Sequence, residues 1–131
     1  MFAIFLAAAL GVQGPYGLES VAEFEEIARA GALDVATPVI VCVRGRVEAH
    51  EVAATELGSP QRARDFALEQ LAACGFGRAQ AKLTEHLLER LPSNREVAER
   101  RANGYFAYVR DVMLVKTAEH FKVAPVPMQK R

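Results

Sequence analysis

The chain has 131 residues, of which 51% are hydrophobic, and its 16 basic and 16 acidic side chains give a formal net charge of zero. A length of this order is typical of one domain, and so much apolar material excludes a globally disordered chain. We therefore predict one compact domain over residues 1–124, followed by a short tail over residues 125–131.

Charge is distributed unevenly along the chain. Residues 1–58 have a net charge of −5 and residues 59–131 a net charge of +5. Opposite charges on the two halves suit head-to-tail pairing of two copies, or a basic face turned toward an acidic partner. The favoured interpretation is simpler, namely that these charges solvate the exposed faces of helices.

The chain opens with ten residues that carry no charge, MFAIFLAAAL. A membrane-spanning helix needs about 20 apolar residues, and a signal peptide begins with basic residues that are missing here. We predict a short buried helix over residues 2–10, with a strand over residues 2–6 as the alternative. Contact with a partner or a membrane surface, and a targeting remnant, are the other roles considered.

A second helix is predicted after a glycine-rich loop. Ser20 and Glu23 have the spacing of a capping box, so the helix should begin there and run to about Ala30. Gly31 should then form a left-handed cap. Together with residues 2–10, this segment predicts an N-terminal helix-loop-helix.

The faces of this second helix follow from its periodicity. The apolar side chains should face the core, and they include Val21, Phe24 and Ile27. The acidic run should form the face in water, and it consists of Glu23, Glu25 and Glu26.

A small β element is predicted near residues 38–52. Residues 38–43, PVIVCV, are rich in β-branched side chains and begin with a proline, which is tolerated at the first position of a strand. Residues 47–52 alternate well enough for a second strand, although a helix through residues 53–57 fits equally well.

Three helices are predicted in the second half of the chain. Ser59 caps the first, which ends at Gly75, and the second covers residues 78–91 and stops at a proline. A capping box over residues 93–96 opens the third and longest helix, which runs to about Phe121. Within it, Gly104 indicates a kink or a close crossing of helices.

The fold class predicted from these elements is mainly α, with α+β as the alternative. It consists of three C-terminal helices in a bundle-like arrangement, the N-terminal helix-loop-helix and the small β element.

No haem, zinc or nucleotide motif is recognisable, so we predict no cofactor and no metal. The three histidines lack the clustered spacing of zinc ligands. Cys42 and Cys74 are too few for a disulfide-stapled secreted domain, so we expect buried free thiols and a cytoplasmic protein. A small enzyme that uses Cys42 or His50 is the weakest of the functional hypotheses.

A nucleic-acid hypothesis comes from the short turn at residues 74–77. Two helices joined by such a turn can place the second helix in a DNA major groove. The candidate contacts are Arg78, Gln80, Lys82, Arg95, Arg100 and Arg101. Against this interpretation, acidic side chains alternate with these basic ones.

The leading hypothesis is non-catalytic protein–protein interaction, as an adaptor or a structural subunit of a larger, oligomeric assembly. Both ends of the chain are apolar, although the elements between them can form a core alone. The candidate interface residues are Phe2, Ile4, Phe5, Leu6, Val126 and Met128.

Overall fold

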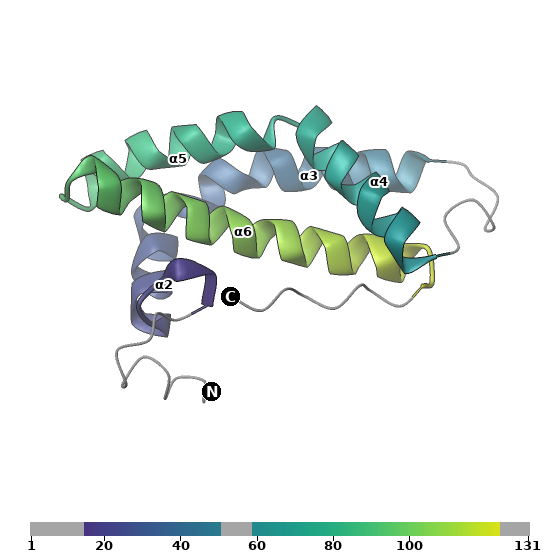
Figure 1. Ribbon diagram of the computed structural model, residues 1–131. Coiled ribbons are helices and arrows are strands. Elements are labelled where there is room, and N and C mark those ends of the chain that lie inside the picture. The colour runs from purple at the N-terminus through teal and green to yellow at the C-terminus, as the bar shows by residue number, and fades with distance from the viewer. Residues whose placement is uncertain (1–14, 51–58, 124–131) are drawn as a thin grey trace. The chain divides into compact units, whose positions relative to one another are not determined.

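In the computed structural model, residues 15–50 and 59–123 are described, and they form helices joined by turns (Figure 1). In chain order, the elements are the 3-10 turn η1 (Pro15–Gly17), α2 (Val21–Ile27), the π-type turn η2 (Ala28–Ala32), α3 (Leu33–Ala49), α4 (Pro60–Ala73), α5 (Phe76–Arg90) and α6 (Arg95–His120). The mainly α prediction and the three C-terminal helices are confirmed. The predicted helix over residues 2–10 lies outside the described residues.

The predicted β element is wrong, because α3 covers all but the last residues of this segment and no strand occurs in residues 15–50 or 59–123. Its buried side chains are three and four residues apart, as on one side of a helix: Ala36, Val39, Val43 and Val47. Burial along this stripe outweighs the β propensity of the valines. Even Pro38 lies inside α3. Residues 51 and 52 are not among those described.

The described residues fall into two compact units. The first contains residues 15–36 and 78–108, and the second contains residues 37–50, 59–77 and 109–123. In the first unit the largest fully buried side chains are Ile27, Leu83, Leu87 and Phe106, and in the second they are Val43 and Thr117. The single domain over residues 1–124 stays a prediction, and the tail lies outside the described residues.

Side-chain caps fix where the helices begin. Ser20 and Ser59 accept hydrogen bonds from the backbone N–H groups three residues later, at 3.1 and 3.2 Å, as predicted. The capping box at residues 93–96 is wrong by one position. Asn94 Oδ1 accepts from the backbone N–H of Val97 at 2.8 Å, so α6 begins at Arg95. Asparagine caps a helix as well as serine does, and the hydroxyl of Ser93 is buried without a hydrogen bond to any described residue.

Gly31 lies in η2, the short turn between α2 and α3. Its φ is 103°, as the predicted left-handed cap requires. Beside it, the Nε2–H of His86 donates a hydrogen bond of 2.7 Å to the carbonyl oxygen of Ala30. A Cβ atom on Gly31 would lie 2.8 Å from that nitrogen. Both the backbone angle and the space available therefore require glycine.

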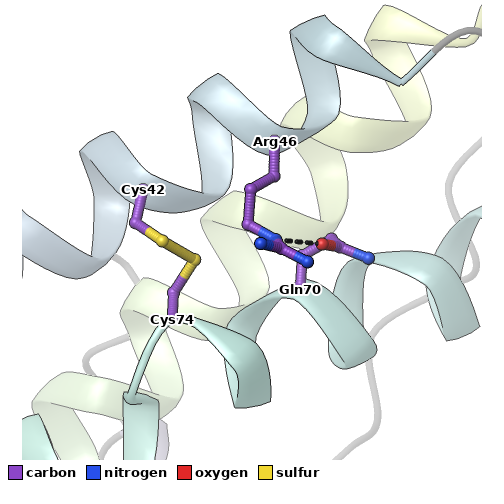
Figure 2. Close-up of a disulfide and its surroundings, with 4 residues drawn as sticks. All are labelled: Cys42, Arg46, Gln70 and Cys74. Carbon is purple, nitrogen blue, oxygen red and sulfur yellow. Dashed lines mark hydrogen bonds between the residues drawn. A yellow bond between two sulfur atoms is a disulfide. The ribbon is translucent and has the colours of Figure 1, made fainter.

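A disulfide in the second unit joins Cys42 on α3 to Cys74, directly after α4, with the Cα atoms 5.8 Å apart (Figure 2). The prediction of two free thiols is wrong. One turn away on each helix, Arg46 donates from Nε to the Oε1 of Gln70. Residues four apart lie on the same face of a helix, so these two contacts hold one face of α3 against one face of α4.

We expect Gly31→Ala to lower the free energy of unfolding by about 1–3 kcal/mol, because alanine is strained at this φ and crowds His86. Gly45→Ala is the matched control. It lies inside α3 with nothing within 4 Å of the new Cβ, so it should stabilise by about 0.5–1 kcal/mol. Urea unfolding followed by circular dichroism measures both variants, and equal effects would contradict the assignment of Gly31.

We expect reduction of the Cys42–Cys74 bond to lower the free energy of unfolding by roughly 3–4 kcal/mol. The cysteines are 32 residues apart, and opening a loop of that length releases chain entropy in the unfolded state. The measurement is urea unfolding with and without dithiothreitol. The double variant Cys42→Ala, Cys74→Ala should not respond to the reductant, and a wild-type chain equally indifferent to it would refute this role of the bond.

Candidate partner interface

The first unit has an apolar surface formed by η1, α2 and α6. We call it the aromatic patch and define it by Tyr16, Val21, Phe24 and Tyr108. Val21 is 51% exposed and Tyr108 is 41% exposed, while Tyr16 and Phe24 are half-buried. With Leu18 and Ser20, the patch lines a depression of about 150 Å³.

The rings of the patch pack against one another. Phe24 meets Tyr108 edge to face, with ring centroids 5.0 Å apart, and Tyr16 meets Tyr108 in the same way at 6.1 Å. On the inner side, Phe24 stacks on the buried ring of Tyr105 at 5.3 Å. Such pairs add stability beyond burial alone, so each exposed ring has a fixed neighbour.

Gly104 allows η1 and the residues after it to approach α6. A Cβ at this position would lie 2.7 Å from the carbonyl oxygen of Tyr16 and 2.9 Å from the side chain of Leu18. Only glycine leaves that space. The segment that approaches α6 at Gly104 is η1 with the residue after it, whereas the sequence predicted a kink or a close crossing of helices.

Tyr16 has a left-handed backbone, with φ 62° and ψ 22°. A non-glycine residue in this region costs on the order of 1 kcal/mol and persists only where its surroundings hold it. The turn directs the ring of Tyr16 toward Tyr108, so the strained residue belongs to the patch itself.

The carboxylate of Glu23 holds the segment before α2 against α6. It lies 2.8 Å from Arg100 Nη2 and 2.9 Å from Arg101 Nε, and it is only 7% exposed. The backbone N–H of Glu19 donates to it at 2.7 Å. Arg100 also donates to the carbonyl oxygen of Gly17 at 2.9 Å. One buried anion thus connects η1, the start of α2 and the N-terminal part of α6.

This environment changes the titration of Glu23. Burial raises the pKa of its carboxyl, but the hydrogen bonds from Arg100, the Glu19 backbone and Arg101 together outweigh burial. The pKa therefore falls from 4.5 to about 2. The hydrogen bond to Glu23 in turn raises the pKa of Arg100.

Two predictions for α2 are wrong. Val21, expected in the core, is exposed, and Glu23, expected in water, is buried. Periodicity alone gave the wrong faces. It does not reveal that two arginines on α6 compensate the burial of the Glu23 carboxylate. The available signal was the capping-box glutamate in a chain that also contains adjacent arginines at 100 and 101.

The residues predicted to contact nucleic acid all lie in the first unit. Arg100 and Arg101 bind Glu23, and Arg95 forms an exposed ion pair with Glu85 at 2.8 Å. Gln80 donates a hydrogen bond to Asn103, and the two remaining candidates are exposed, namely Arg78 and Lys82. Contact between these residues and nucleic acid stays a prediction.

Cys42 and His50, the candidates for a small enzyme, lie apart. The sulfur of Cys42 is bonded to Cys74. His50 lies roughly 12 Å further along the axis of α3, and its ring centroid is 4.4 Å from that of Phe66. The six candidate interface residues lie outside the described ranges: Phe2, Ile4, Phe5, Leu6, Val126 and Met128.

Within the described ranges, no three His, Cys, Asp or Glu side chains are placed to hold a metal. None of the helices described is both long and apolar enough to cross a membrane. Comparison with models of known protein families, with curated proteins and with solved structures finds no match to the chain.

We expect Glu23→Gln to lower the free energy of unfolding by about 2–4 kcal/mol at neutral pH, because two arginines lose their charged partner. The folded pKa of Glu23 is below the unfolded one, so its contribution is complete above about pH 4.5 and is lost as the pH falls toward 2. The variant should lose this acid dependence.

Urea unfolding between pH 2 and 7 measures the effect, and Glu25→Gln, an exposed change on the same helix, is the control. The role assigned to Glu23 fails if both variants unfold alike, or if Glu23→Gln keeps the acid dependence of the wild type.

Proposed function

We propose that the protein is a non-catalytic interaction subunit that associates with a second copy of itself through the aromatic patch. The observation that carries this proposal is the exposure of Val21 and Tyr108 at a surface whose aromatic rings are already fixed. Exposed apolar patches on soluble proteins are typical of contact surfaces.

The size of the depression favours a protein over a small molecule as the partner. Sites for small molecules have volumes of about 300–1,000 Å³, whereas this depression has about 150 Å³. That is room for one apolar side chain of a partner. Tyrosine is also among the side chains that contribute most at protein interfaces.

The rigidity of the patch supports the same function. Phe24 rests on the buried Tyr105, and η1 is held to α6 through Arg100 and Glu23. Association orders flexible side chains at a cost of about 0.5–1.5 kcal/mol each. Little of that cost remains where rings are already packed against one another.

One feature of the sequence favours a second copy as the partner. The uncharged residues 1–10 precede η1 by only a few positions, so they can supply apolar side chains for the patch of another copy. Symmetric self-association is also the commonest arrangement of soluble oligomers.

We expect Val21→Asp and Tyr108→Ala each to weaken self-association at least tenfold, measured by light scattering over a range of concentrations. Val21→Asp removes an apolar contact and yet favours α2, because an acidic residue suits the first turn of a helix. Deletion of residues 2–10 should also reduce association while helicity by circular dichroism stays nearly unchanged.

Val41→Asp is the matched control, because Val41 is 56% exposed but belongs to the second unit, and it should associate like the wild type. A wild-type chain that stays monomeric at high concentration would refute self-association. Equal weakening by Val41→Asp would refute the assignment to the aromatic patch.

A further inference from the structure

The second unit contains a groove between α3 and α6 with a volume of about 390 Å³. Its floor is apolar and consists of Ile40, Val47, Val112 and Met113. Val47 and Met113 are buried, while the other two are half-buried. The volume falls within the range of small-molecule sites, unlike the depression at the aromatic patch.

The rim of the groove is mainly basic. It contains Arg44, Lys116 and His120, together with the single acidic residue Glu48. Lys116 reaches Glu119 at 3.8 Å, but both side chains are largely exposed, so this pair is weak. Among the described residues, Arg44 has no ion pair. Its guanidinium is therefore available beside an apolar floor.

We propose that this groove binds a medium-chain monocarboxylate. The carboxylate would accept hydrogen bonds from Arg44 and Lys116, which lie on α3 and α6 respectively. The alkyl chain would cover the apolar floor. Arginine is suited to the carboxylate because its planar fork matches the two oxygens, and charge-assisted hydrogen bonds are the stronger kind.

The apolar floor gives the proposed site a further selectivity. Its four side chains offer no partner for a charge. A second carboxylate at the other end of the ligand would lose its hydration on this floor, or would have to remain in water. The groove should therefore prefer an acid with one charged end to a dicarboxylate of the same length.

The test is calorimetric titration of the full chain with decanoate, kept below the concentration at which it forms micelles. We expect saturable binding with one site per chain. Arg44→Gln and Lys116→Gln should each weaken it about tenfold, as the loss of one charge-assisted hydrogen bond implies. Sebacate, which has a carboxylate at both ends, should bind more weakly than decanoate.

Arg78→Gln is the matched control, since it removes an exposed arginine from the first unit and should bind decanoate like the wild type. Decanol tests the charge: it should bind more weakly than decanoate and be indifferent to Arg44→Gln. Absence of saturable binding, equal binding by Arg44→Gln, or equal affinity for decanol would each overturn the proposal. Because the groove and the aromatic patch lie in different units, a Val21→Asp chain should still bind decanoate.

Discussion

The buried carboxylate of Glu23 is the constraint on which the first unit depends. Arg100 and Arg101 hold it from α6, while Ser20 and the backbone of Glu19 hold the chain that leads into α2. A charge that is nearly excluded from water is tolerated only when its hydrogen-bonding capacity is satisfied, and here donors approach both of its oxygens. The same contacts determine the geometry of the surface outside them. The link from α6 to η1 helps to keep Tyr16 in its strained backbone conformation against Tyr108.

The second unit is held together by different means. Its core is mainly aliphatic. A covalent bond joins α3 to the end of α4, and one turn away Arg46 contacts Gln70. The two units therefore offer two kinds of surface. One presents aromatic rings without a charge among them, while the other has an apolar groove edged by cations. A protein side chain suits the first and a small amphipathic anion suits the second, so the two proposals do not compete.

The sequence predicted helices well wherever their ends carry a signal. Ser20, Ser59 and the glycines at 31 and 75 mark boundaries because capping depends on local geometry. The prediction was wrong for α3. Its valines and the proline at its predicted start favour a strand locally, and only burial against distant residues makes a helix stable there. The prediction also misassigned Glu23 and Val21 and missed the disulfide. Burial of Glu23 depends on a residue 78 positions away, and pairing of Cys42 with Cys74 spans 32 positions, so no local pattern contains either.

The disulfide also determines how the chain can carry a mechanical load. Because it joins residues 42 and 74, a force applied to the two ends passes through the sulfur–sulfur bond and bypasses the peptide between them. All of α4 lies in this bypassed ring, so pulling on the ends does not stretch it, even when the rest of the chain is fully extended. The oxidised chain should therefore extend about 100 Å less than the reduced one, given the length of an extended residue. A pore that threads the protein from one end must admit the two arms of this ring together with the chain beside them, or wait until the bond is reduced.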